Sequence, residues 1–83
     1  MVSTPLNNMH GYTVSLVRAN KAAPSHMLGV RLGRACIKAG VSVIQVAKDF
    51  EVSRTAVYAW FCGRSSPSWR LENAIEKYIK ELA

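Results

Sequence analysis

The chain has 83 residues, with 11 Lys and Arg against 5 Asp and Glu, and a formal net charge of +6 at pH 7. This length allows one small domain. The excess of basic residues favours a polyanionic partner, through phosphate contacts and counterion release. No apolar run is long enough to span a membrane. Cys36 and Cys62 fit no metal-binding spacing and are too few for a disulfide scaffold, so we expect reduced thiols in a cytoplasmic protein without a metal or other cofactor.

Residues 1–24 are expected to form an arm or linker, flexible or extended, ahead of the folded domain. Residues 1–11 mix Ser, Thr, Pro, Asn and Gly without periodicity, which indicates loop or disorder. Residues 12–17 alternate apolar and polar side chains, a weak strand signal, and such a strand would have to pair with a twin from a second subunit or stay unstructured. In the basic linker that follows, Arg18 and Lys21 could track phosphates or enter a minor groove; the alternative is an inert tail.

The domain proper is expected at residues 25–83 and begins with a predicted helix capped by Ser25, running from residue 26 to about residue 39. Its apolar stripe comprises Leu28, Leu32, Ala35, Cys36 and Ala39. Gly29 and Gly33 each weaken the helix by ~1 kcal/mol relative to Ala, so tertiary packing must hold it. They also permit close approach of another backbone.

Two short helices joined by a tight turn are predicted at about residues 43–50 and 54–62. Ser42 and Ser53 are suitable N-caps, and Gly63 is a natural stop because the residue after a helix often needs positive φ. The inner faces carry Val46, Ala47 and Phe50 in the first helix and Val57 and Trp60 in the second.

The outer face of the second short helix contains no acidic residue. It comprises Arg54, Thr55, Ala56, Tyr58, Ala59 and Cys62. Arg can bind guanine in a bidentate way, Thr can donate, accept or contact a thymine methyl, and Ala can contact a methyl. This composition suits a major groove lined by phosphates, although a solvated face of a protein-binding module would have a similar composition.

A loop and a last helix complete the predicted domain. Arg64, Ser65 and Ser66 are short donors that would lie over a sugar-phosphate strand if the preceding helix enters a groove, or would form an ordinary turn. The last helix is predicted from residue 67 or 68 to about residue 81, with Trp69 closing the bottom of the core. Its apolar stripe is Leu71, Ala74 or Ile75, Tyr78, Ile79 and Leu82.

From about residue 28 to residue 79 the chain resembles the phage repressor/Cro type of helix-turn-helix domain. Residues 28–42 are similar to the first helix of that family and the turn after it, and residues 63–67 are similar to its glycine-to-proline loop. The spaced core positions of the family's motif are matched by Ala47, Val52, Ser53, Val57 and Trp60.

The resemblance implies a compact all-α domain of four to five helices, lambda-repressor-like, in which the helix starting at Arg54 is the recognition helix. Members commonly bind double-stranded operator DNA as homodimers. The implied base-reading residues are Arg54, Thr55, Ala56, Tyr58 and Ala59, and the implied phosphate contacts are Ser42, Gln45, Ser53, Cys62, Arg64, Ser65 and Ser66.

Two positions depart from the family pattern. Glu51 stands where Gly is usual, which costs strain of order 1 kcal/mol or alters the turn. Val43 stands where a polar residue usually holds a phosphate. Val43 and its neighbour Ile44 could instead mark a contact with a protein partner, or pack against the arm.

Charge and motif together favour a transcription regulator, phage- or prophage-encoded, that represses by occluding operator DNA. The alternatives are an accessory protein in excision or packaging, or a protein-interaction module such as an antitoxin or host-polymerase inhibitor. The last 17 residues carry no net charge, so the final helix is expected to pack or dimerise rather than bind phosphate. Catalysis is not expected, because the sequence offers only His10 and His26 and no nucleophile–base pair at usable spacing.

Overall fold

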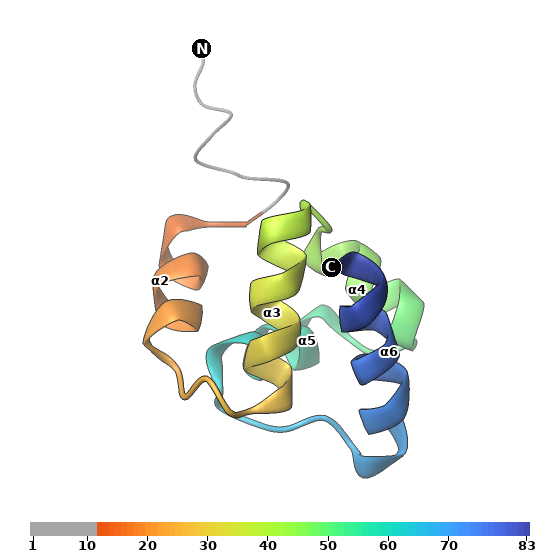
Figure 1. Ribbon diagram of the computed structural model, residues 1–83. Coiled ribbons are helices and arrows are strands. Elements are labelled where there is room, and N and C mark those ends of the chain that lie inside the picture. The colour runs from red at the N-terminus through yellow and green to blue at the C-terminus, as the bar shows by residue number, and fades with distance from the viewer. Residues whose placement is uncertain (1–11) are drawn as a thin grey trace.

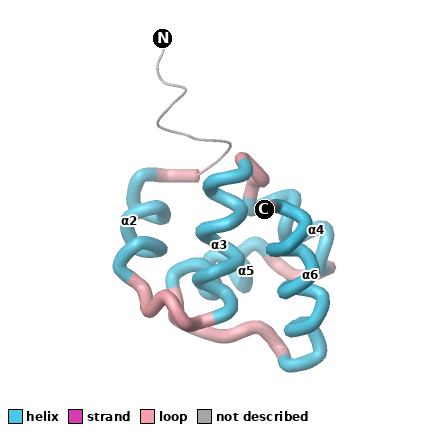
Figure 2. Tube along the Cα trace, viewed as in Figure 1, coloured by secondary structure: helices cyan, strands magenta, loops and turns pink. Residues whose placement is uncertain are grey.

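The structure, a computed structural model, describes residues 12–83, and within them it is helical throughout, with no strand (Figures 1 and 2). The elements are α2 (Val14–Ala22), α3 (Leu28–Ala39), α4 (Val43–Phe50), α5 (Arg54–Cys62), the 3₁₀ turn η2 (Trp69–Leu71) and α6 (Glu72–Leu82). Figure 1 shows α3 between α2 and α6, with α5 behind it, and α3 packs against all three. The prediction of an all-α domain is confirmed. The arm predicted at residues 1–11 lies outside the described residues.

The strand predicted at residues 12–17 and the linker predicted after it are wrong, because Val14–Ala22 forms α2. Thr13 caps this helix, and its hydroxyl accepts a hydrogen bond from the backbone N–H of Leu16 at 3.1 Å. The buried positions of α2 are Leu16 and Asn20, four residues apart on one face of the helix, and Tyr12, which precedes the N-cap, is also buried. The sequence pattern does not reveal this helical face because Asn20 is polar. Since α2 packs against α3 and α5, the folded domain includes residues that we had assigned to the arm.

Two polar side chains hold α2 in place. The buried Asn20 side chain donates from Nδ2 to the carbonyl oxygens of Val30, at 3.3 Å, and Phe61, at 2.8 Å. Arg34 donates from Nη2 to three carbonyls at the end of α2, those of Asn20, Lys21 and Ala23, at 3.2–3.3 Å. Buried polar groups are costly unless they are paired, so these bonds fix α2 relative to both α3 and α5.

The helix predicted from residue 26 begins later, at Leu28, and the predicted cap at Ser25 is wrong because the N-cap is Met27, without a side-chain bond. The expected close approach at its glycines is confirmed. A Cβ added at Gly29 would lie 2.7 Å from the carbonyl oxygen of Trp60, and one at Gly33 would lie 2.8 Å from Cγ of Phe61. The backbone of α5 therefore crosses α3 at a distance that only glycine allows.

The two short helices have the predicted bounds. Ser42 and Ser53 are their N-caps, and each hydroxyl oxygen accepts the backbone N–H three residues on, at 3.1 Å. Glu51 ends α4 in the left-handed region at φ 56°, as its place in the turn suggested, and Gly63 ends α5 at φ 76°. These local signals are strong because each satisfies backbone groups that the helix end leaves unpaired.

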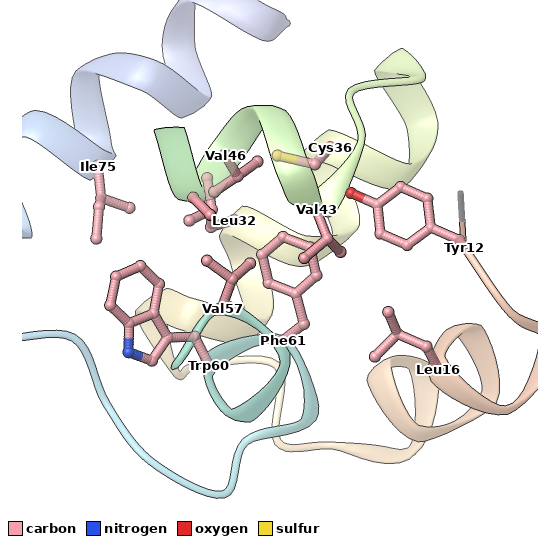
Figure 3. Close-up of a cluster of buried hydrophobic side chains, with 11 residues drawn as sticks. Tyr12, Leu16, Leu32, Cys36, Val43, Val46, Val57, Trp60, Phe61 and Ile75 are labelled. Atoms are coloured by element: carbon pink, nitrogen blue, oxygen red, sulfur yellow. The ribbon is translucent and has the colours of Figure 1, made fainter. Parts of the chain in front are cut away.

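Within residues 12–83 the core joins the five α-helices around the inner face of α5 (Figure 3). Phe61 is fully buried, and its ring stacks with Tyr12 at a centroid distance of 6.1 Å. The Tyr12 hydroxyl donates to the carbonyl of Val41, just before α4. On the opposite side of the cluster, Trp60 lies towards Ile75 of α6 (Figure 3). The helix α5 is thus held from both sides.

The C-terminal part differs from the prediction in two respects. The last helix begins at Glu72, after η2, rather than at residue 67 or 68. Trp69 is 76% exposed, so it does not close the core, and the Arg70 guanidinium lies 5.7 Å from the centre of its ring. Ile75, fully buried, is the inward residue of the pair left open with Ala74.

Candidate nucleic-acid interface

The two faces of α5 have different chemistry. Val57, Trp60 and Phe61 lie in the core, whereas Arg54, Thr55 and Tyr58 are exposed. The remaining positions that the sequence assigned to the outer face, Ala56, Ala59 and Cys62, are half-buried. The exposed surface is therefore narrow, with a cation, a hydroxyl and a phenol on it and small residues beside it. A backbone flanked by alanines can come close to a ligand.

Two arginines stand at opposite ends of this surface. Arg54 is the first residue of α5, and Arg64 follows the glycine that ends it; both are exposed. The backbone N–H of Arg64 donates to the carbonyl of Ala59 at 2.9 Å, which holds the loop against the end of the helix. Nine helical residues at a 1.5 Å rise span roughly 13 Å, close to the width of the major groove of DNA. Ser65 and Ser66 are exposed on the same loop.

A polar chain joins α4 to α6. Gln45, predicted to contact phosphate, donates from Nε2 to Oδ1 of Asp49 at 2.7 Å, and the Tyr78 hydroxyl donates to Oδ2 of the same carboxylate at 2.7 Å. Burial, followed by this hydrogen bond and the charge of Asp49, raises the pKa of the Tyr78 phenol above its usual range. In this structure the Gln45 amide is committed to its own helix, so a phosphate contact would require it to turn away from Asp49.

The predicted apolar pair at the start of α4 is split by the fold. Val43 is 3% exposed and belongs to the core, so its predicted role in a protein contact is wrong, whereas Ile44 is 50% exposed. The first helical turn rotates neighbouring residues by about 100°, which is enough to turn one inward and the next outward.

The predicted arm contacts, Arg18 and Lys21, are exposed residues of α2. Lys21 borders a groove of about 260 Å³ between α2 and α3, together with Val17, Asn20, Arg34, Ile37 and Lys38. This basic groove was not predicted, because α2 was not. A second groove, of about 330 Å³, lies between α3 and α6 and is lined by Ala35, Lys38, Ala39, Ile79, Leu82 and Ala83.

The two cysteines and the residue types that ligate metals are a further source of candidate sites within residues 12–83. Cys36 is fully buried in the core, as expected, and this burial raises the pKa of its thiol to about 12. Cys62 is half-buried at the end of α5. Among residues 12–83 no three His, Cys, Asp or Glu side chains come together as metal ligands, and none of the helices there has the length and apolar content needed to cross a membrane.

No protein family, no curated protein and no solved structure matches this chain. A fold alone does not define a function, so the functional argument depends on the side chains and charges of the surface. That surface has two basic regions, one along α5 and the other between α2 and α3.

Proposed function

We propose that this chain is a sequence-specific double-stranded DNA-binding protein in which α4 and α5 act as a helix-turn-helix and α5 is the recognition helix. The observation that carries the proposal is the exposed face of α5, where Arg54, Thr55 and Tyr58 project and no acidic residue occurs from residue 53 to residue 66. The buried opposite face holds this helix rigidly, as base readout requires.

Each exposed side chain has a role in the proposed complex. Arg54 donates two hydrogen bonds to a guanine edge, Thr55 contacts a base or a thymine methyl, and Tyr58 reads a base or donates to a phosphate. Arg64 and the Ser65 hydroxyl bind the sugar-phosphate strand beyond the end of α5. The small half-buried residues beside them leave room for the groove wall.

The proposed regulator acts as a dimer that occludes operator DNA. The C-terminal segment that contains α6 is a suitable dimer surface because residues 67–83 carry three acidic and three basic side chains, and the groove between α3 and α6 lies along this helix. A two-fold dimer would place two copies of α5 about one helical turn of DNA apart. Sedimentation of the free chain, and of the chain on DNA, tests this state directly.

The experiment that tests the function is selection from a random duplex DNA pool, with the bound fraction sequenced and re-titrated at low and at physiological salt. Enrichment of a short inverted repeat, with half-sites about one helical turn apart, supports the dimeric operator-binding protein. A single half-site would indicate a monomer. Binding without enrichment that disappears at physiological salt would contradict the proposal, since it requires only a basic surface.

Two variants separate base reading from phosphate binding on the selected site. Arg54→Ala should weaken specific binding by ~1–3 kcal/mol and relax the preference at one base pair, whereas Arg64→Ala should weaken binding to all sequences and reduce the salt slope by about one unit. Lys21→Ala is the matched control, because it removes one exposed cation from α2, beside a groove that the proposed DNA complex and the proposed dimer do not use. Equal losses on all sequences for Arg54→Ala would show that this arginine binds phosphate.

An accessory or protein-interaction role for the same fold is the second candidate. The specific observation in its favour is the basic groove between α2 and α3, which the DNA complex described above does not use. The two roles are compatible, since a DNA-bound protein can recruit a partner through its far side.

A further inference from the structure

The groove between α2 and α3 combines an apolar floor with a basic rim. Val17 of α2 and Ile37 of α3 are its half-buried aliphatic residues, and Lys21, Arg34 and Lys38 border it. Its volume of about 260 Å³ is enough for a large side chain rather than a whole cofactor. An apolar hollow surrounded by charge is the usual form of an anchor site for a partner's side chain.

Lys38, on the rim of the groove, lies on the side of α3 away from α5. Gly29 of α3 lies against Trp60 of α5, and Lys38 is nine residues further on, a rotation of about 180° around a helix with 3.6 residues per turn. Figure 1 shows α5 behind α3, with α2 beside α3 on the left. A DNA duplex on the exposed face of α5 would therefore leave this groove free.

The charge around the groove is not neutralised within the described fold. The sequence has no acidic residue before Asp49, and the one ion pair among residues 12–83 joins Arg31 to Glu76, at 2.9 Å, on the side of α3 that meets α6. The hydrogen bonds of the Arg34 side chain go to backbone carbonyls of Asn20, Lys21 and Ala23, which carry no charge. The rim therefore presents three cations, Lys21, Arg34 and Lys38, and no acidic side chain among the described residues forms an ion pair with them.

We propose that the α2/α3 groove binds an acidic amphipathic segment of a partner protein. An aliphatic or aromatic side chain of that segment enters between Val17 and Ile37, and its flanking carboxylates pair with Lys21 and Lys38. This inference goes beyond DNA binding by α5 and does not depend on it.

Two observations favour this occupant over others. A second copy of the chain is disfavoured, because a two-fold contact through the groove would bring Lys21, Arg34 and Lys38 near the same residues of the partner copy. An anionic membrane is disfavoured because the apolar residues are recessed between two helices, whereas insertion into lipid requires them to protrude.

The test is selection of peptides from a random twelve-residue display library on the full chain, followed by fluorescence anisotropy with the labelled, synthesised peptides. We expect enriched peptides to carry two or more Asp or Glu residues around a Leu, Ile, Phe or Trp. The double variant Lys21→Glu/Lys38→Glu should raise the Kd at least tenfold. The matched control Lys48→Glu/Lys77→Glu makes the same change in net charge at exposed positions of α4 and α6, and it should change the Kd less than threefold.

Circular dichroism first establishes that both double variants fold, and amide NMR shifts then locate the bound peptide. Shifts centred on Val17 and Ile37 support the proposal, and shifts centred on α5 overturn it. It is also overturned if no peptide is enriched, if the enriched peptides lack acidic residues, or if both double variants lose affinity equally. A different outcome would assign the groove to a membrane surface instead. In that case phosphatidylserine vesicles bind the chain but not its Lys21→Glu/Lys38→Glu variant, and no peptide binds.

Discussion

Replacing Gly29 by Ala sets helix propensity against packing in α3. In an isolated helix the change stabilises by ~1 kcal/mol. Here the new Cβ would lie 2.7 Å from the carbonyl oxygen and 2.8 Å from Cβ of Trp60, whereas ordinary contact begins at 3.4 Å. The two helices must separate by about 0.7 Å, and the clashing atoms belong to or adjoin the α5 backbone, so no side chain can simply rotate away. Overpacking of this kind costs typically ~1–3 kcal/mol.

We therefore expect Gly29→Ala to lower the free energy of unfolding by up to about 2 kcal/mol, because the packing cost offsets or exceeds the propensity gain. Urea unfolding followed by circular dichroism measures this change in the free energy of unfolding, provided that the slope of the free energy against urea concentration is the same for both chains. Ala35→Gly, at a half-buried position of the same helix, calibrates the glycine penalty and should cost about 0.5–1 kcal/mol. A gain of about 1 kcal/mol for Gly29→Ala would refute the close crossing of α3 and α5.

Three further predictions follow from the same structure. Glu51→Gly should raise the free energy of unfolding by up to about 1 kcal/mol in urea titrations, because glycine tolerates the left-handed conformation. Glu51→Ala is the control: alanine keeps a Cβ and should bring no such gain. Burial raises the pKa of Cys36 from its ordinary 9.0 to about 12 and raises the pKa of Tyr12 beyond its usual range. The unfolded chain therefore ionises at a lower pH than the folded chain, so the free energy of unfolding should fall as the pH rises above about 9. In unfolding measurements between pH 7 and 11, Cys36→Ala should reduce the first part of this decrease. Val43→Asp should unfold the domain because it places a charge in the core. Ile44→Asp, at an exposed position, should change stability by less than about 0.5 kcal/mol in thermal melts. Equal effects of the two variants would contradict the burial of Val43 and the exposure of Ile44.

The elements that sequence reasoning located well are those with local end signals. The bounds of α4 and α5 follow from Ser42 and Ser53 at their starts and from Gly63 at the end, since each of these residues acts within a few positions of itself. The inner faces followed from helical spacing for the same reason. The outer face of α5 was then found by elimination, without knowledge of the rest of the fold.

The features that sequence reasoning missed depend on distant partners. The inward stripe of α2 includes Asn20, whose partners lie in α3 and α5, so its burial makes sense only once those carbonyls are in place. The apolarity of Trp69 predicts a core position, but its side chain is exposed, whereas Trp60 and Ile75 are buried in the core. The basic groove required α2 to be a helix, and no local pattern revealed that.

The positions of the charges change what the net charge of +6 means. Of the exposed cations, Arg54 and Arg64 lie along the proposed DNA surface, whereas Arg18, Lys21 and Lys38 lie on α2 and the far side of α3. A helix is about 10 Å thick, which exceeds the Debye length of about 8 Å at physiological salt, so cations behind α3 contribute little to phosphate binding by α5. Bulk charge was therefore a weaker argument for DNA than the α5 face itself. The excess on the far side can attract an acidic ligand of its own, and this is the physical reason for proposing a different partner for each surface.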